Sequence, residues 1–288
     1  MSNSDGAASS LGRVLVIAGS DSGGGAGIQA DIKSIMAQGA YATTAITALT
    51  AQNTHGVDDV LDVPAAFVAR QIQTIMADIG TDIFKTGMLH RREIIELVAQ
   101  HCTGKTAPPL VVDPVMVATS GHRLLEDKAI DVVMQLLVEK AYLVTPNLPE
   151  ASLMTRRDVE TLDDMKRAAD TLMNKGAHAA LIKGGHGQER VVYDLLAQQN
   201  GFEVFENQRL ITKNTHGTGC TLASAIAGQL ARQVTQKKGE DAAPHSPLDI
   251  SQAVQHALGY VHHAIATAPD NIGSGHGPLN HLPPALEQ

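Results

Sequence analysis

Apolar residues occur along this chain in two alternating patterns. The run RVLVIAG (residues 13–19) is short, continuous and ends in glycine, which predicts a buried strand. In residues 24–38 the apolar side chains Ile28, Ile32 and Ile35 instead recur at three- and four-residue steps, which predicts a helix with one buried side. This change from continuous run to helical spacing repeats along most of the chain.

Further strands are predicted at 41–50, 82–88, 109–114, 141–147 and 177–185, and further helices at 64–78, 92–100, 125–138, 162–172 and 250–267, with another after Gly219. Residues 190–197 and 201–207 predict an antiparallel pair of strands. The polar stretch 235–249 predicts a surface loop.

Strands and helices alternate in this order without an intervening linker. The order predicts one α/β domain over residues 13–288, with a mostly parallel central sheet and helices on both faces. The preceding residues 1–12, MSNSDGAASSLG, are rich in Ser, Asn, Gly and Ala, and we expect them to form a disordered tail.

Composition and charge exclude several classes of protein. The net charge of -8 and the pI near 5.9 argue against a nucleic-acid or anionic-membrane partner, which would require a basic face. No apolar run approaches the roughly 18 residues of a membrane span, and the N-terminus lacks the pattern of a signal peptide. Two cysteines, Cys102 and Cys220, cannot build a disulfide framework, so we expect a cytoplasmic protein with reduced thiols.

A glycine-rich stretch follows the first predicted strand. Five glycines fall within residues 19–27 of AGSDSGGGAGIQAD, at the end of a strand where ligands bind in open parallel sheets. Glycines let the backbone pass close to a ligand, although a flexible connecting loop is the simpler interpretation. The spacing is not a dinucleotide fingerprint, because residue 28 is Ile where the third glycine would fall.

Polar residues follow three later strands. Asp113 ends a buried strand, and Asn147 and Glu150 follow the next. Each alone would suit a cap or a turn, but together they offer the oxygen ligands that Mg²⁺ prefers. Lys183 closes another strand and could place a point charge against a phosphate.

The stretch KNTHGTGCTLASAIA (213–227) places Gly217 and Gly219 ahead of a predicted helix and Cys220 at its first turn. Backbone N–H groups and the helix dipole make such a turn an anion site, suited to a transferring phosphoryl group. The dipole is also expected to lower the pKa of Cys220 from about 8.5 towards roughly 3.5–7.5. The alternative is that Cys220 is a small buried hydrophobe, as we expect for Cys102.

Six segments together resemble bacterial hydroxymethylpyrimidine/phosphomethylpyrimidine kinases of the ribokinase-like superfamily. They are residues 17–57, KTGML (85–89), VVDPVM (111–116), TPNLPEA (145–151), LIKGGH (181–186) and the stretch at 213–227. The resemblance runs from about residue 13 to the tail GHGPLNHL. A Gly-x-Gly near a helix start occurs across the superfamily, whereas the pair GGGAGIQAD and HGTGCT is specific to this branch.

The resemblance implies a reaction of thiamine biosynthesis. ATP, with Mg²⁺, would phosphorylate 4-amino-5-hydroxymethyl-2-methylpyrimidine and then its monophosphate to the pyrophosphate. The family also suggests a homodimer. At the substrate, Gln52 would hydrogen-bond the aminopyrimidine edge, because a carboxamide offers both a donor and an acceptor. The resemblance further implies pocket-lining roles for Asp31, Gly19 and Ala26, and packing against the ring for Met88 and Val115.

At the phosphates, the resemblance implies that Asn147 and Glu150 organise Mg²⁺ and the nucleotide, with Asp113 nearby. Lys183 and Thr215 would bind phosphate. Cys220 stands where much of the superfamily has an aspartate base, and would assist deprotonation of the substrate hydroxyl. Gly217 to Gly219 would form the anion hole. Thr50 departs from the branch, in which valine is common at this position.

Two other functions stay open on the sequence. A pyridoxal or pyridoxine kinase of the same fold could use the same cysteine to trap an aldehyde, although Gln52 favours the aminopyrimidine. A non-catalytic ligand-binding protein on this fold would be expected to have lost phosphate-binding residues, yet Lys183, Gly217 and Gly219 are all present.

Overall fold

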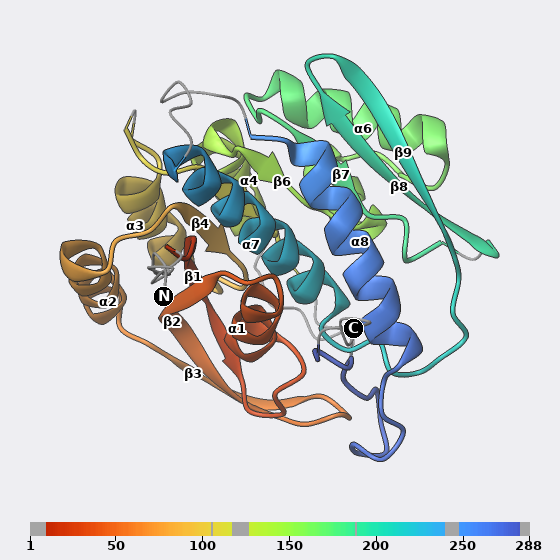
Figure 1. The fold of residues 1–288 in the computed structure, drawn as a ribbon, viewed down its shortest axis with the longest axis horizontal. Helices are drawn as coiled ribbons and strands as arrows, with labels where there is room; N and C mark the ends of the chain where they lie inside the picture. The colour runs from red at the N-terminus through yellow and green to blue at the C-terminus, as the bar shows by residue number, and fades with distance from the viewer. Residues whose placement is uncertain (1–9, 105, 117–126, 188, 240–247, 283–288) are drawn as a thin grey trace, which may run out of the picture.

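The protein is described by a computed structural model over residues 10–104, 106–116, 127–187, 189–239 and 248–282. Within these ranges nine strands form one sheet in the order β3-β2-β1-β4-β5-β6-β7-β8-β9 (Figure 1). Their bounds are β1 Arg13–Asp21, β2 Tyr41–Gln52, β3 Val57–Asp62, β4 Ile83–Thr86, β5 Leu110–Val112, β6 Leu143–Val144, β7 Ala180–Ile182, β8 Val191–Gln198 and β9 Gly201–Gln208. Strands β2 to β7 in this order pair in parallel, and β3, β8 and β9 are antiparallel additions at the two edges.

Helices cover both faces of the sheet, as predicted. They are α1 Gly27–Ala37, α2 Ala65–Asp78, α3 Arg92–Cys102, α4 Asp127–Leu136, α5 Leu148–Thr155, α6 Leu162–Asn174, α7 Thr218–Gly239 and α8 Ile250–Ala266, with a short 3-10 helix at Val138–Lys140. Helices α1, α7 and α8 lie on the face turned toward the viewer in Figure 1, and the others pack on the opposite face or at its edge.

Strand β1 shows why its residues form a continuous apolar run. Val14 and Val16 point into the core beneath α7, where they pack with Ile226. Leu15 and Ile17 alternate to the other face and join the core that contains α2 and α3. Because both faces of the strand are covered, residues 14–18 are all apolar, and the polar residues of β1 lie at its two ends.

Helix α1 begins three residues later than predicted. Gly24 and Gly27 have positive φ angles of 78° and 54°, which keep residues 24–26 out of the helix. A β-carbon at Gly27 would lie 2.5 Å from the carbonyl oxygen of Gly19, so the glycine permits the helix to start directly against β1.

Helix α7 is longer at both ends than the sequence indicated. It begins at Thr218, so that Gly219 lies within its first turn rather than ahead of it, and it continues through Gly239. The first part of the predicted loop 235–249 is therefore helical, and residues 240–247 of that loop lie outside the described residues. Of the predicted tail, residues 1–9 also lie outside them, while Gly12 is buried and its carbonyl accepts a hydrogen bond from the N–H of Tyr41.

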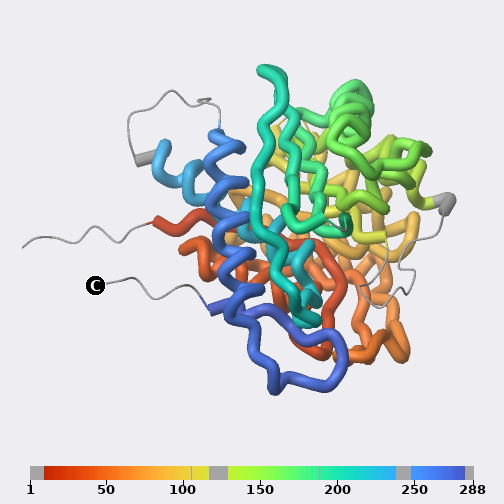
Figure 2. Tube along the Cα trace, turned by 90° about the vertical axis from the view of Figure 1, so that its right-hand side faces the viewer, coloured from red at the N-terminus to blue at the C-terminus, as the bar shows by residue number. Residues whose placement is uncertain are grey.

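The segment after α8 returns to the sheet. In Figure 2 this blue segment passes along the lower edge of the molecule, and the β8–β9 hairpin stands beside α8. The N–H of His276 donates to the carbonyl of Thr54, and the N–H of His216 donates to the carbonyl of Gly277. The segment thereby fastens the loop after β2 to the loop before α7.

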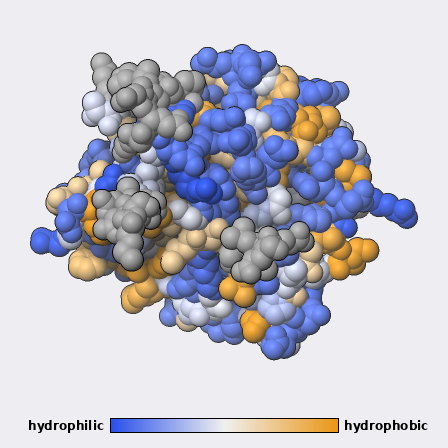
Figure 3. Space-filling model, in the orientation of Figure 1, coloured by the Kyte–Doolittle hydropathy of each residue, from blue (hydrophilic) through white to orange (hydrophobic). Residues whose placement is uncertain are grey.

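The outer surface is mostly polar on the face drawn in Figure 3, with hydrophobic residues in small separate groups. Among the residues with described placement, we find no helix of the length and apolar character needed to cross a membrane.

Candidate active site

A cavity of about 640 Å³ opens at the carboxyl ends of the parallel strands. Its wall combines the ends of β1 and β4 to β7 with the first turn of α7, which is the place where ligands bind in open α/β sheets. Nearly all of the predicted site residues line this cavity: Gly19, Ala26, Gln52, Met88, Asp113, Val115, Asn147, Glu150, Lys183, Thr215, Gly217, Gly219 and Cys220.

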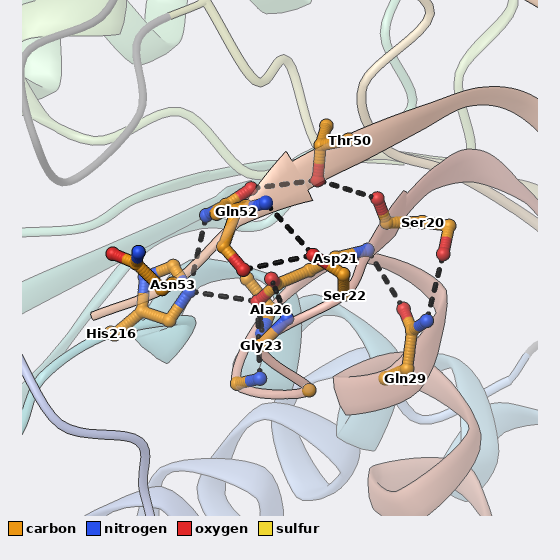
Figure 4. A network of polar contacts seen from close by, with 12 residues as sticks. Ser20, Asp21, Ser22, Gly23, Ala26, Gln29, Thr50, Gln52, Asn53 and His216 are labelled. Carbon is orange, nitrogen blue, oxygen red and sulfur yellow. Dashed lines mark hydrogen bonds and ion pairs between the residues drawn. The ribbon is translucent and has the colours of Figure 1, made fainter. Parts of the chain in front are cut away.

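Asp21 organises the glycine-rich loop at one end of the cavity (Figure 4). Its carboxylate accepts hydrogen bonds from the backbone N–H groups of Gly23 at 2.8 Å, Gly25 at 3.1 Å and Ala26 at 2.8 Å. His216 Nε2 contacts the same carboxylate at 2.8 Å. Burial alone would raise the pKa of Asp21, but the hydrogen bonds from His216 and from the loop backbone outweigh it and hold that pKa below its usual value.

The loop before α7 lies directly against the glycine-rich loop. Gly217 has a φ of 83°, and a β-carbon there would lie only 1.8 Å from the carbonyl oxygen of Gly25. Any other residue at 217 would therefore separate the two loops. A β-carbon at Gly219 would lie 3.2 Å from Lys183 Nζ, so the second glycine brings the ammonium group close to the start of α7.

The first turn of α7 supplies donors to the cavity. N–H groups in the first turn of a helix have no carbonyl partner within the helix. The N–H of Thr218 donates to the carbonyl of Thr215 at 3.3 Å, so the N–H groups of Gly219 and Cys220 are the first-turn donors left for the anion site predicted over 217–219.

Lys183 and two buried carboxylates line the cavity near the start of α7. Lys183 Nζ lies 3.0 Å from Asp113 Oδ1 and 3.9 Å from Glu150 Oε2. Burial would lower the pKa of Lys183, but the two carboxylates raise it above its usual value. Burial raises the pKa of Glu150 to about 7, against the opposing effect of the Lys183 charge. Asp113 Oδ2 is buried and has no hydrogen-bond partner among the described residues.

Asn147 and Glu150 also form a helix cap, the structural role that their three-residue spacing allows. Asn147 caps α5, with its side-chain oxygen 2.9 Å from the N–H of Glu150, and Glu150 Oε2 accepts the N–H of Asn147 at 2.8 Å. This capping box holds the Glu150 carboxylate at the cavity wall, so the structural and functional interpretations of this pair are compatible.

The structure places Asp31 elsewhere than predicted. It is fully buried on the inner side of α1 and does not line the cavity. Its Oδ1 lies 2.8 Å from Lys85 Nζ, also fully buried, and 2.7 Å from Ser224 Oγ. Burial would lower the pKa of Lys85, but the Asp31 carboxylate raises it above its usual value, which indicates a charged pair. Asp31 therefore links α1 to β4 and α7 beneath the cavity instead of contacting a ligand in it.

Cys220 differs from the prediction in its acidity. The helix start was expected to lower its pKa, but burial raises the pKa of the thiol to about 12. The Lys85 charge and the Gly27 N–H favour the thiolate, while Asp31 and Asp113 oppose it. The thiol lines the cavity and is neutral at physiological pH in the absence of a ligand.

Two residues of this site were missed in the sequence, Asp21 and His216. Asp21 lies within the glycine-rich stretch, and His216 directly precedes Gly217. Asp21 and His216 contact each other but are 195 positions apart in the sequence, so no local sequence pattern connects them. The usable signal was a carboxylate followed by consecutive glycines, whose N–H groups can turn back toward it.

Comparisons with known proteins agree on one family. Residues 21–280 match the family model described as phosphomethylpyrimidine kinase. The hydroxymethylpyrimidine/phosphomethylpyrimidine kinase of Bacillus subtilis is 41% identical over 274 residues, which cover 95% of this chain and 96% of that protein. The thiamine biosynthesis bifunctional protein ThiED of Geobacter sulfurreducens is 44% identical over 271 residues, 94% of this chain but 52% of that protein. The chain thus spans about half the length of that bifunctional relative.

A solved structure shares the fold. The ADP complex of Bacillus subtilis pyridoxal kinase has a TM-score of 0.83 and 33% identity, over 94% of this chain and 98% of that one. The fold, the site and these likenesses define a kinase, an enzyme that transfers a phosphoryl group. The chain belongs to the phosphomethylpyrimidine kinase family, which confirms the resemblance seen in the sequence.

Proposed function

We propose that the protein transfers the γ-phosphoryl group of ATP to 4-amino-5-hydroxymethyl-2-methylpyrimidine and then to its monophosphate, in thiamine biosynthesis. The observation that carries this proposal is the meeting of two chemistries at one cavity. The cavity is lined both by a carboxamide, Gln52, and by the Lys183 ammonium with two carboxylates. Cys220 lies on the cavity wall with them.

The ring of the substrate would occupy the Gln52 end. The carboxamide can pair with an aminopyrimidine edge, which presents a ring-nitrogen acceptor beside an amino donor. Met88 and Val115 form the hydrophobic cluster at this end with Ala48, and can cover the faces of the ring. A β-carbon at residue 19 would lie 2.3 Å from Met88 Cε, so the glycine at this position lets the Met88 side chain occupy its place against the ring. This arrangement would turn the hydroxymethyl group toward Cys220.

The phosphates of ATP would lie between Lys183 and the first turn of α7, close to Thr215. The ammonium group and the N–H groups of Gly219 and Cys220 are donors that stabilise the charge on a transferring phosphoryl group. The substrate oxygen attacks the γ-phosphorus, the bond to the β–γ bridging oxygen breaks, and ADP leaves. In this proposal Cys220, as thiolate, takes the hydroxyl proton.

Asp113 and Glu150 have the character of a magnesium site. Asp113 Oδ2 is a buried carboxylate oxygen without a hydrogen-bond partner among the described residues, and Glu150 is held beside it by the capping box. Within those residues no cluster of three or more His, Cys, Asp or Glu forms a complete cage. Two carboxylates suit Mg²⁺, which keeps several waters and also binds phosphate. The ion would supply charge neutralisation on the phosphates, with Asn147 positioning Glu150.

Pyridoxal phosphorylation is the second candidate, and the likeness to a pyridoxal kinase structure favours it. We expect kcat/KM for the hydroxymethylpyrimidine to exceed that for pyridoxal by at least about tenfold, because one unpaired buried polar group costs on the order of 1–3 kcal/mol. Measuring ADP release by the full chain with each ring decides between them. The reverse order of kcat/KM would assign the site to pyridoxal.

The homodimer and the cytoplasmic location stay predictions of the sequence. A non-catalytic binding protein is disfavoured because Lys183 and both carboxylates are arranged around the cavity.

A further inference from the structure

The Gln52 backbone is fixed at the mouth of the cavity. Ser22 Oγ donates to the Gln52 carbonyl at 2.8 Å and accepts the Gln52 N–H at 2.8 Å, which ties the end of β2 to the glycine-rich loop (Figure 4). With the backbone held in this way, the orientation of the Gln52 side-chain amide determines which of its atoms a ligand meets. This orientation matters, because an amide turned by 180° exchanges its donor for its acceptor.

His216 lies at one side of the Gln52 side-chain amide and limits which amide atom can face it. Its Nε2 contacts Asp21 Oδ2 at 2.8 Å, and that carboxylate also accepts N–H groups of the glycine-rich loop. An oxygen in this setting is an ionised acceptor, so His216 Nε2 must carry a proton. With that proton directed at Asp21, His216 Nε2 has no lone pair that could accept a hydrogen bond from an amide N–H. The Gln52 amide atom 3.4 Å away is therefore better accounted for as Oε1 than as Nε2.

Thr50 lies at the other side of this amide. Its hydroxyl has one proton. The carbonyl of Ser20, 2.9 Å from Thr50 Oγ1, competes for that proton with the amide atom placed as Gln52 Oε1, which is 3.1 Å away. Once that proton is donated to Ser20, Thr50 Oγ1 faces Gln52 with lone pairs. The amide atom there must be a donor, which requires Nε2. Thr50 and His216 thus favour the same orientation, which is the reverse of the one drawn in Figure 4.

We propose that Thr50 and His216 are positioning residues that hold the Gln52 carboxamide in one orientation, with Nε2 on Thr50 and Oε1 on His216. The second N–H and the second lone pair of the amide then face the cavity in a fixed order. They suit a ring edge that carries an acceptor beside a donor. This proposal rests on the proposed function for the identity of the ring, but the orientation itself does not.

Thr50→Val tests the proposal, because valine keeps the β-branched shape and removes only the hydroxyl. We expect KM for the hydroxymethylpyrimidine to rise about three- to tenfold, the equivalent of one hydrogen bond, with kcat and KM for ATP unchanged. Thr50→Ser, which retains the hydroxyl, is the matched control and should stay near the wild type. In a Gln52→Ala background Thr50→Val should have no further effect on KM.

Equal effects of Thr50→Val in both backgrounds would overturn the proposal, since Thr50 would then act without Gln52. A wild type that does not phosphorylate the pyrimidine would instead overturn the proposed function. The orientation is then tested without substrate, from the NMR signals of the Gln52 side-chain NH₂, assigned by their loss in Gln52→Ala. They should shift in Thr50→Val and not in Thr50→Ser, and unmoved signals would also overturn the proposal.

Discussion

Replacing Cys220 with alanine is expected to lower kcat by about 10²–10⁴-fold, the range of a general base, with KM for ATP little changed. The thiol lies on the cavity wall at the first turn of α7. Steady-state kinetics of the purified variant measure the loss. Cys102→Ala is the matched control, because Cys102 is the last residue of α3, lies in the core away from the cavity, and its replacement should leave kcat unchanged.

The pH profile adds a second readout for Cys220. Burial raises the pKa of this thiol to about 12, so the thiolate is the minor form at neutral pH and grows tenfold with each pH unit. If the thiolate takes the proton, kcat rises with pH without a plateau over the range in which the protein stays folded. The rise should be absent in Cys220→Ala. A flat profile for the wild type would contradict the role as base.

Replacing Lys85 with methionine is expected to lower the free energy of unfolding by about 3–5 kcal/mol, because it leaves a buried carboxylate without its partner. Lys85 Nζ and Asp31 are both fully buried and 2.8 Å apart. Urea denaturation followed by circular dichroism measures the loss, since the chain has no tryptophan for fluorescence. Lys166→Met removes an exposed pair with Asp163 and should cost less than about 1 kcal/mol.

The Lys85→Met deficit should depend on pH. Burial raises the pKa of Asp31, and without Lys85 the folded protein would take up a proton there more readily than the unfolded chain. A folded-state pKa above the unfolded value adds stability at low pH that is lost as pH rises. The deficit should therefore shrink as the pH falls, and adding Asp31→Asn should remove this dependence. A deficit under 1 kcal/mol would mean that the pair is not a buried ion pair.

The fold was largely predictable because its order follows from local patterns. In β1 the need to cover two faces forces a continuous apolar run, and in α1 burial of one side forces the helical spacing. The boundaries were less predictable. The start of α1 depends on positive φ angles at Gly24 and Gly27, and these in turn depend on Asp21 and on the contact with Gly19.

The site was predictable where each residue stands at a strand end. Asp113, Glu150 and Lys183 meet because parallel strands bring their carboxyl ends to one edge. The position of Asp31 could not be predicted, because the spacing of apolar residues in α1 does not show whether the side of the helix that carries Asp31 faces the cavity or α7. The pKa of Cys220 could not be predicted from the helix start alone, since Asp31, Asp113 and the burial come from other elements.

The central claim is that one cavity adds two phosphoryl groups to an aminopyrimidine. Mass spectrometry of the product, after incubation of the full chain with ATP, Mg²⁺ and 4-amino-5-hydroxymethyl-2-methylpyrimidine, tests it most directly. A parallel reaction contains pyridoxal, and Lys183→Met, which removes the ammonium group at the phosphate end, serves as the control. The account predicts the pyrimidine pyrophosphate with the wild type and neither phosphorylated pyrimidine with the variant. Phosphorylation of pyridoxal alone would contradict it.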